Sequence, residues 1–356
     1  MDTVNTAVTL AGKKSWIIGT VNTPAGNIPQ IATRLNSSDH LGTIKVRFGL
    51  QRMHYTVDPG LYAVGRPTAE SPVFVSANYK LSFDYLRREL EGINGWIMVI
   101  DTKGVNVWCA AGKGTFGTEE IIKRIESTHL SEVVSHRQII VPQLGAPGVA
   151  AHEVKRRSSF RVIFGPVRAP DIPEFLDGGM KTSPEMRRVD FNLSDRMVLI
   201  PVELVQWSPF ALAAALVLFF LTGISRNGYT LPGWMGGREV LIVILAFITG
   251  SALVPILLPW LPGRALSVKG MTLGLIFAIV LVFTGLIPST QTGGQLETAA
   301  WILLMPAIGA FTAMNFTGST TYTSLSGVKK EMRFAVPAQI IAAAIGLSLW
   351  MTARFF

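Results

Sequence analysis

Hydrophobic residues are distributed very differently in the two parts of this chain. Up to about Val205, short apolar runs alternate with charged segments and with Gly and Pro turns, the pattern of a soluble α/β protein. Beyond Ser208, long apolar runs take over, and charged residues are confined mainly to the gaps between them. The pattern therefore predicts an α/β domain followed by a helical membrane domain.

Five apolar runs after Ser208 are long enough to cross a bilayer, which requires about 20 mostly apolar residues. We predict spans at residues 209–224, 240–260, 271–287, 299–316 and 334–351. They follow one another with short loops, which argues against the alternative of buried helices in a large soluble core. We find no Asp, Glu, Lys, Arg or His deep in a span, so the residues that mark ion or proton pathways are not expected there.

Basic residues between the spans predict their orientation. With the N-terminal domain inside, the inner side collects Lys181, Arg187, Arg188, Arg196, Arg264, Lys269, Lys329, Lys330 and Arg333, and the outer side collects Arg226, Arg238 and Arg354. Residues 1–26 show no basic stretch followed by an apolar core, so we expect no cleaved signal peptide. We therefore predict a multi-pass protein of the cytoplasmic (inner) membrane, with its N-terminal domain in the cytoplasm.

Composition agrees with this division. The chain has 32 Lys and Arg against 23 Asp and Glu and is 49% hydrophobic, and its mean hydropathy of +0.39 is high for a soluble protein. A basic balance often indicates nucleic-acid binding, but here no Lys/Arg-rich run interleaves with aromatic residues. We expect membrane lipid and no nucleic acid as a partner.

The N-terminal part alternates strands and helices. Strands are predicted at residues 72–76, 96–101, 138–141, 160–164 and 197–202, and helices at 82–90 and 118–127. This order predicts a Rossmann-like, mostly parallel sheet. Residues 1–40 show no strong pattern, so we divide the chain into an N-terminal arm (1–40), an α/β domain (41–205) and a membrane domain of five helices (206–356).

Cys109 is the only cysteine of the chain, and it lies in the short segment Asn-Val-Trp-Cys-Ala-Ala-Gly-Lys at residues 106–113. Asn106 is a good N-cap, so we predict an exposed helical turn with Cys109 in its first turn, where backbone N–H groups favour a thiolate. Lys113, four residues on, adds positive charge if the segment is helical. A lone cysteine is more often a small buried residue. If Cys109 has a chemical role, it acts as a single ligand or as a nucleophile.

Gly112, Gly114 and Gly117 match the G-x-G-x-x-G spacing of dinucleotide sites and precede a predicted helix. The Cys109 segment separates them from the preceding strand, and residues 135–143 offer no acid for a ribose hydroxyl, so this interpretation is weak. Further Gly-rich runs at 143–148, 165–169 and 101–104 follow predicted strands and together favour a broad, flat ligand. The five histidines match neither the Asp-x-His-x-x-Gly corrinoid signature nor a zinc pair.

The 106–113 segment resembles, at every position, the cap-helix motif N-[VI]-W-C-A-[AG]-G-K of the mercury-methylation corrinoid proteins, the HgcA family. The resemblance extends through residues 59–62, 73–79, 112–118, 141–152 and 165–169. These segments are also similar to the corrinoid domain of the corrinoid iron–sulfur protein large subunit of acetyl-CoA synthesis. That relative has a four-cysteine cluster domain and a barrel, which this chain lacks. Ser76 stands where relatives commonly have threonine.

The resemblance implies a base-off corrinoid cofactor with Cys109 as the lower axial cobalt ligand and methyl transfer from methylcobalt to Hg(II), giving methylmercury. It implies that Ser76, Ala77 and Asn78 line the methyl-bearing face. The remaining cofactor-binding residues that it implies are Asn106, Val107, Trp108, Ala110, Lys113, Gly114, Thr115, Gly117, Gly145 and Gly148. An HgcB-like ferredoxin with two iron–sulfur clusters is implied as reductant, and a methyltetrahydrofolate-linked pathway as methyl donor.

Three other functions stay open from the sequence. The first is a membrane-anchored corrinoid methyl carrier for one-carbon metabolism, which differs only in the methyl acceptor. The second is a transporter with a cytoplasmic regulatory domain, which the apolar spans disfavour. The third is a nicotinamide-dependent oxidoreductase, which depends on the weak glycine motif.

Overall fold

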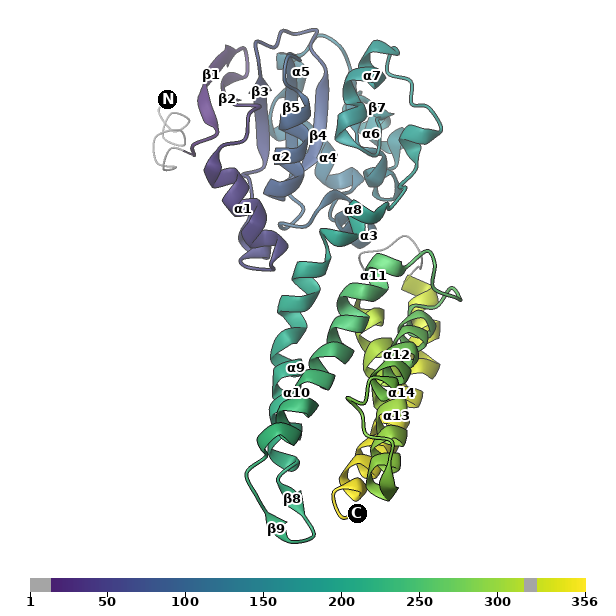
Figure 1. The fold of residues 1–356 in the computed structure, drawn as a ribbon. Helices are drawn as coiled ribbons and strands as arrows, with labels where there is room; N and C mark the ends of the chain where they lie inside the picture. Colours follow the sequence, from purple (N-terminus) through teal and green to yellow (C-terminus); the bar gives the residue numbers. More distant parts are fainter. Residues whose placement is uncertain (1–13, 317–324) are drawn as a thin grey trace. The chain divides into compact units, whose positions relative to one another are not determined.

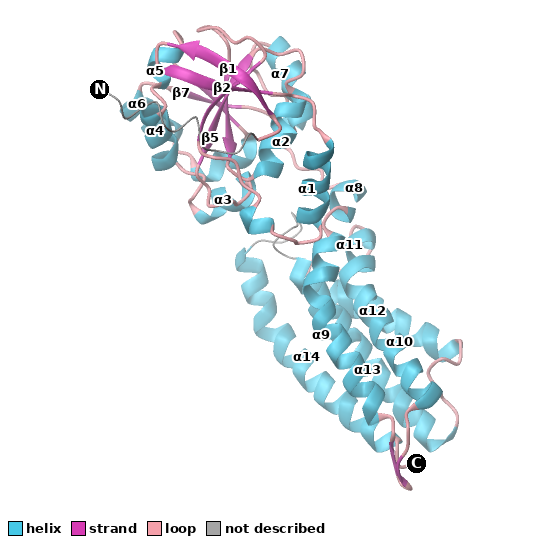
Figure 2. Ribbon diagram, turned by 90° about the vertical axis from the view of Figure 1, so that its left-hand side faces the viewer, coloured by secondary structure: helices cyan, strands magenta, loops and turns pink. Residues whose placement is uncertain are grey.

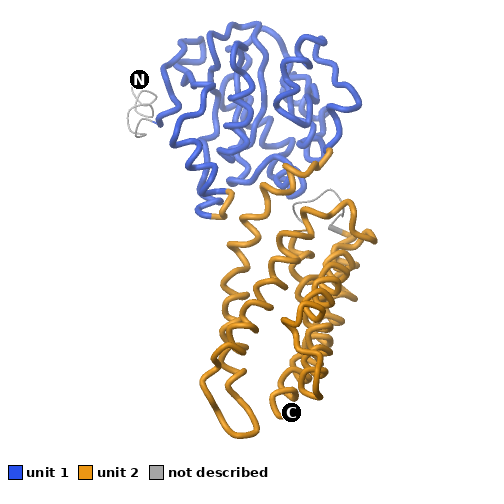
Figure 3. The backbone as a smooth tube through the Cα atoms, in the orientation of Figure 1, with its two compact units in different colours: residues 1–46, 50–189 blue, residues 47–49, 190–356 orange. Residues whose placement is uncertain are grey.

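The computed structural model describes residues 14–316 and 325–356. By their contacts these residues form two compact units (Figure 3). The α/β unit comprises the chain up to Val46 and Leu50–Val189, and the helical unit comprises Arg47–Gly49 and Asp190–Phe356. The contacts thus divide the chain near residue 190, earlier than the predicted boundary at 205.

A seven-stranded sheet forms the centre of the α/β unit, in the order β1-β2-β3-β5-β4-β6-β7 (Figures 1 and 2). Its strands are β1 (Ile17–Thr23), β2 (Gly26–Ile31), β3 (Gly60–Val64), β4 (Val73–Ala77), β5 (Gly95–Ile100), β6 (Gln138–Val141) and β7 (Arg161–Phe164). Strands β5, β4, β6 and β7 run parallel, whereas β3 pairs antiparallel with β5 and β1 pairs antiparallel with β2. The predicted parallel core is therefore confirmed, within a mixed sheet.

Helices cover both faces of this sheet. They are α1 (Ser37–Arg47), α2 (Lys80–Glu89), α3 (Val107–Lys113), α4 (Thr118–Ser127), α5 (Leu130–Val133), α6 (Ala151–Ser158) and α7 (Ile172–Asp177). Alternate residues of β5 point into two separate cores, with Trp96 and Met98 facing α4–α6 and Ile97 and Val99 facing α2 and α7. Because both faces are buried, β4 and β5 are continuous apolar runs, which made them recognisable in the sequence.

Two predictions about the ends of this unit are wrong. Residues 17–31, assigned to a loose arm, form the β1–β2 hairpin, and β2 pairs parallel with β3. The run at 197–202, predicted as a strand, lies in helix α8 (Leu193–Met197) and the start of α9 (Ile200–Leu221). Pro201 stands in the first turn of α9, where proline is compatible with a helix, and a short apolar run alone does not distinguish strand from helix.

A buried network of charges ties α1 to α2. Lys80 Nζ donates to Asp39 Oδ1 at 2.7 Å and to Asp84 Oδ2 at 2.6 Å. Arg87 Nη2 donates to Asp39 Oδ2 at 2.6 Å, and its Nε donates to Asp84 Oδ1 at 2.7 Å. All four side chains are almost fully buried. Each carboxylate is therefore paired with two cations, which compensates the loss of hydration.

This network predicts a loss of stability in acid. Burial alone would raise the pKa of Asp39, but the hydrogen bonds from Lys80 and the Asn36 N–H, with the charges of Lys80 and Arg87, hold it below its ordinary value of 3.8. A lowered folded-state pKa stabilises the fold fully above pH 3.8, and this contribution is lost as the pH falls through the folded-state pKa. We expect the unfolding temperature of the α/β unit to decrease as the pH falls below 3.8. Circular dichroism of the full chain in micelles measures this temperature. Asp39→Asn should flatten that fall, and an unchanged slope would contradict the assignment.

Among the described residues, the helical unit has five helices long and apolar enough to cross a membrane, which agrees with the number of predicted candidate spans. Its further elements are α10 (Gly233–Ile248), a π-helical turn (Thr249–Leu253), α11 (Val254–Leu257), α12 (Leu266–Phe283), α13 (Gln291–Asn315) and α14 (Leu325–Ala353). Glycines allow close packing here: a side chain at Gly274 would lie 2.7 Å from the carbonyl oxygen of Met305.

The sequence predicted no ionisable residue deep in a span, and the structure has buried charged residues near the ends of candidate spans. Arg238 and Glu239 of α10, Glu297 of α13 and Arg354 just after α14 form a buried cluster. Arg238 Nη2 donates to Glu239 Oε1 at 2.7 Å and also to Glu297 Oε1, and Arg354 Nη2 donates to Glu297 Oε2. Arg238 and Arg354, assigned to the outer side from the sequence, are thus partners of buried carboxylates in the helical unit. Without them, the predicted excess of basic residues on the inner side is larger.

Candidate functional site

The carboxyl ends of the parallel strands β4, β5, β6 and β7 lie at one edge of the sheet, where open α/β folds bind ligands. The loop after β5 leads into α3, and the loop after β6 forms a 3₁₀ turn, η2 (Gln143–Gly148). Helix α3 packs against η2. The structure therefore brings the predicted residues of the β4 end, of α3 and of η2 to the same edge.

Helix α3 presents Cys109 as predicted. The Asn106 side chain caps the helix, because its Oδ1 accepts a hydrogen bond from the Cys109 N–H at 2.9 Å. Ala110 and Ala111 are buried in the core, whereas Cys109 is half-buried and Trp108 is 38% exposed. The predicted cap and the exposed helical turn are thus confirmed.

Asn78, at the end of β4, connects this strand to the loop before α3. Its Oδ1 accepts hydrogen bonds from Thr102 N (3.0 Å), Thr102 Oγ1 (2.8 Å) and Gly104 N (3.0 Å), and its Nδ2 donates to Asp101 Oδ1 (3.3 Å). Asn78 is buried, and its amide group is largely occupied by this loop. In this structure it holds the segment that carries Cys109.

We expect Asn78→Ala to loosen that segment. The backbone N–H groups of Thr102 and Gly104 lose their acceptor, and each unsatisfied buried group costs about 1–3 kcal/mol. Hydrogen exchange of residues 101–109 in the full chain should become faster. Asn94→Ala is a matched control, since Asn94 Oδ1 accepts from the Arg66 N–H at 2.8 Å at the opposite edge. Equal exchange of residues 101–109 in both variants would contradict this role.

Asp101 and Lys103, the charged residues of the loop before α3, pair with each other. Lys103 Nζ donates to Asp101 Oδ2 at 2.6 Å, and this hydrogen bond holds the pKa of Asp101 below its ordinary value. The Asp101 N–H donates to Glu120 Oε1 at 3.0 Å, which joins the end of β5 to α4. Both contacts stabilise the loop conformation that precedes α3.

The predicted glycines have conformational and packing roles at this edge. Gly114 ends α3 with a left-handed φ of 81°, and Gly117 is the N-cap of α4. A side chain at Gly145 would collide with the ring of Phe116, at 2.9 Å from its Cδ1 atom, and one at Gly148 would lie 3.2 Å from the Cα atom of Ala111. These glycines let η2 and the 112–117 loop approach each other closely.

The other predicted residues have different exposures. Ser76 and Ala77 are buried within β4, and Ser76 Oγ donates only to the adjacent Ala77 carbonyl oxygen, at 3.4 Å. Val107 and Thr115 are partly buried, and Lys113 is exposed in the last turn of α3. The side chains of β4 thus lie beneath the edge, while Trp108, Cys109 and Lys113 are the accessible ones.

The sequence analysis missed the Thr102 anchor. Thr102 is fully buried, and its hydroxyl shares one proton between Asn78 Oδ1, at 2.8 Å, and the Val105 carbonyl oxygen, at 2.6 Å. The available signal was the short polar run Asp101-Thr102-Lys103-Gly104 directly after a buried strand, which is typical of a structured turn.

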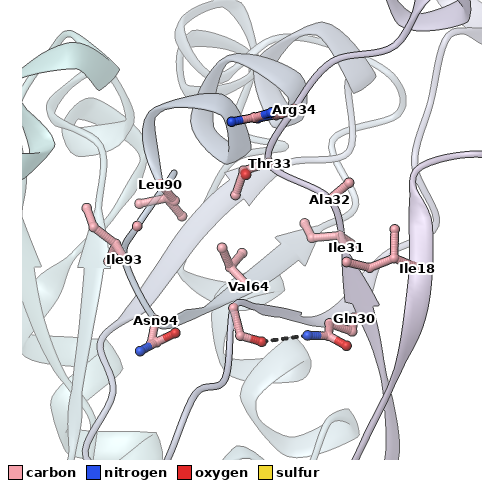
Figure 4. Close-up of a pocket in the computed structure, with 12 residues that line it drawn as sticks. Ile18, Gln30, Ile31, Ala32, Thr33, Arg34, Val64, Leu90, Ile93 and Asn94 are labelled. Atoms are coloured by element: carbon pink, nitrogen blue, oxygen red, sulfur yellow. Dashed lines mark hydrogen bonds between the residues drawn. The ribbon is translucent and has the colours of Figure 1, made fainter.

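A pocket of about 360 Å³ lies at the other edge of the sheet (Figure 4). It is lined by the ends of β2 and β3 and by the segment before β5, and Gln30 Nε2 donates across it to the Gly65 carbonyl oxygen at 2.7 Å. Because β3 is antiparallel to β5, this pocket is at the amino ends of the parallel strands. It is separate from the Cys109 edge.

No group of three or more His, Cys, Asp or Glu side chains is arranged to hold a metal ion within residues 14–316 and 325–356. His129 and His152 pair with neighbouring glutamates, and His136 Nε2 contacts the Ser71 carbonyl oxygen at 2.9 Å. Cys109 is therefore the one thiol among the described side chains.

Comparison with known proteins identifies relatives of the α/β unit. Residues 31–176 match the family described as CO dehydrogenase/acetyl-CoA synthase delta subunit. The gamma subunit of the acetyl-CoA decarbonylase/synthase complex of Archaeoglobus fulgidus is 31% identical over 140 residues, covering 38% of this chain and 29% of that protein. The Methanopyrus kandleri gamma subunit is 33% identical over 123 residues, covering 34% and 26%.

These matches show which part of the chain is similar to the relatives. The chain spans less than a third of the length of the curated relatives it matches. The family match includes β3 to β7 and α3 and ends before the helical unit. The expected similarity to proteins of acetyl-CoA synthesis is therefore confirmed for the α/β unit.

Proposed function

We propose that this protein is a corrinoid-dependent methyltransferase in which the Cys109 thiolate is the lower axial ligand of cobalt and Hg(II) is the methyl acceptor. The observation that carries the proposal is the position of Cys109. It is the sole cysteine, half-buried on a capped helix at the carboxyl edge of the parallel strands, inside the region that matches the acetyl-CoA synthase family.

The residues at this edge fit a large flat ring with a soft lower ligand. Trp108 exposes an apolar indole beside the thiol, and Gly112 and Gly114 have open space where a side chain would stand. Cys109 would ligate the cobalt, and Trp108, Lys113, Gly114 and Thr115 would contact the ring or its side chains. When bound, the corrinoid supplies a cobalt that carries a methyl group, and a thiolate ligand donates electron density to such a metal.

The chain's own contribution is to hold the thiolate in place. Asn106 fixes the first turn of α3, and Ala110 and Ala111 anchor the helix in the core. Asn78 and Thr102 hold the loop on its other side. Such supporting contacts orient a metal ligand and maintain its donor strength.

The proposal that Hg(II) accepts the methyl group depends on the match of residues 106–113 to the mercury-methylation motif. Hg(II) is a soft, thiophilic acceptor. An HgcB-like ferredoxin with two iron–sulfur clusters would serve as the reductant, and a methyltetrahydrofolate-linked pathway would supply the methyl group. The five candidate spans support a place in the cytoplasmic membrane with the α/β unit inside.

A methyl carrier of one-carbon metabolism is the second candidate. The names of the relatives, all subunits of acetyl-CoA decarbonylase/synthase complexes, favour it. The two candidates share the cofactor and Cys109 and differ in the acceptor.

Two measurements test the proposal. The full chain, purified without oxygen in micelles, should bind added cobalamin with a change in its absorbance spectrum, and absence of binding would reject both candidates. Cells that produce the chain with a suitable reductant protein should form methylmercury from Hg(II). Corrinoid binding without methylmercury would favour the one-carbon carrier.

A further inference from the structure

An apolar surface lies on α1 and on the 3₁₀ turn η1 (Arg52–His54) that follows it. Leu41, Ile44, Leu50 and Met53 are each more than half exposed. We call these four residues the α1 face. A group of large exposed apolar residues close together in the chain is a candidate surface for contact with another molecule.

The α1 face is not needed to build the core of the α/β unit. The inner side of α1 is already held by Val46, which is buried, and by Asp39 through its ion pairs with Lys80 and Arg87. Gly42 also lies against the ring of Tyr55. The exposed apolar residues therefore point away from an interior that is complete without them.

The exposed charged residues along Ser37–Thr56 are basic. Lys45 is exposed beside Ile44, Arg52 precedes Met53, and His40 and His54 are exposed at either end. Asp39 is the only acidic residue from Ser37 to Thr56, and it is buried and paired. Apolar side chains bordered by Lys and Arg are a feature of segments that bind to the surface of a membrane.

We propose that the α1 face docks on the anionic surface of a lipid bilayer. Its basic residues complement acidic headgroups, and its four apolar side chains match the boundary between headgroups and acyl chains. Among the described residues, five helices are long and apolar enough to cross a membrane, and the same polypeptide joins them to the α/β unit. This role is independent of the methyl-transfer function proposed above.

Docking of the α1 face on a bilayer would restrain η1, which lies beside the loop that precedes α3. The Met53 carbonyl oxygen lies 2.8 Å from the position of a side chain at Gly104, which adopts a left-handed φ of 71° in the loop before α3. The Val57 N–H also donates to the Asn78 carbonyl oxygen at 2.9 Å. A bilayer that holds η1 therefore also restrains a neighbour of the loop that positions Cys109.

Site-directed fluorescence in the full chain tests this proposal. Cys109→Ser gives a cysteine-free background, in which Leu41→Cys, Ile44→Cys and Met53→Cys are labelled singly with bimane. Ile18→Cys is the matched control, because Ile18 is also an exposed isoleucine of the α/β unit but lies on β1, away from the α1 face. The proteins are placed in nanodiscs of phosphatidylcholine and phosphatidylglycerol with nitroxide-bearing acyl chains.

We expect quenching at 41, 44 and 53 at least about twofold stronger than at 18, because interfacial helices bury their apolar face roughly 5–10 Å into the headgroup boundary. Lys45→Glu with Arg52→Glu, or nanodiscs of phosphatidylcholine alone, should reduce the difference. Quenching equal to that at 18 would overturn the proposal. Protection of the labels from iodide in water without quenching by lipid would also overturn it, since a protein would then cover the face.

Discussion

Cys109→Ala is expected to abolish methyl transfer while leaving the fold intact. Cys109 is the only thiol of the chain, and no other described side chain of α3 can ligate cobalt in its place. Loss of a supporting contact to a metal ligand already reduces affinity or activity about 10–100-fold, so loss of the ligand should exceed about 100-fold. Methylmercury formed by cells measures the activity, and the absorbance spectrum of protein-bound corrinoid measures the ligation.

Two further variants separate ligation from packing. Cys109→Ser keeps the size of the side chain but offers a harder oxygen, and it should be as inactive as Cys109→Ala. Cys109→His offers a neutral imidazole and should restore part of the activity with a different spectrum. Wild-type methylmercury formation by the alanine variant would refute the ligand role, and an altered circular dichroism spectrum would indicate instead that Cys109 supports the fold.

Glu239→Ala is expected to destabilise the helical unit by about 3–5 kcal/mol, the usual effect of breaking a buried ion pair. Glu239 is fully buried, and its Oε2 accepts hydrogen bonds from the indole N–H groups of Trp301 (3.1 Å) and Trp350 (3.0 Å). Its other oxygen pairs with Arg238. The substitution leaves three buried donor groups with fewer acceptors, and unfolding of the full chain by sodium dodecyl sulfate in mixed micelles measures the effect.

Glu239→Gln and Thr272→Ala serve as controls. The glutamine retains an oxygen for the indoles but not the charge, so its effect should be smaller than that of alanine. Thr272 is only partly buried, and its Oγ1 donates to the Val268 carbonyl oxygen of its own helix at 2.8 Å, so its loss should change stability by no more than about 0.5 kcal/mol. If Glu239→Ala unfolds like Thr272→Ala, the ion cluster contributes nothing to stability.

Local sequence signals were sufficient for several elements. Strands β4 to β7 and helix α4 were predictable because their apolar runs are buried on defined faces and are bounded by turn residues. The Asn106 cap was predictable because it joins residues three positions apart. The candidate spans were predictable because a bilayer requires long apolar segments in any fold.

The β1–β2 hairpin was missed although its sequence contains a signal. Its residues alternate between more and less exposed positions, and Pro24 and Gly26 mark the turn between the strands. The corresponding alternation of apolar and polar residue types in the sequence is weak, because the hairpin is at the sheet edge and buries few large side chains. Its attachment to β3, about 30 residues further along the chain, depends on long-range pairing.

The sequence by itself determined the two-part organisation, the parallel core strands and the capped helix of Cys109, because each follows from interactions within a few residues. Only the tertiary structure decided that Asn78 holds the loop around Thr102, 24 residues away. It also decided that Glu239 joins Trp350, 111 residues away, inside the helical unit. Such contacts depend on which helices and strands become neighbours, and residue patterns in one segment do not specify a partner in another.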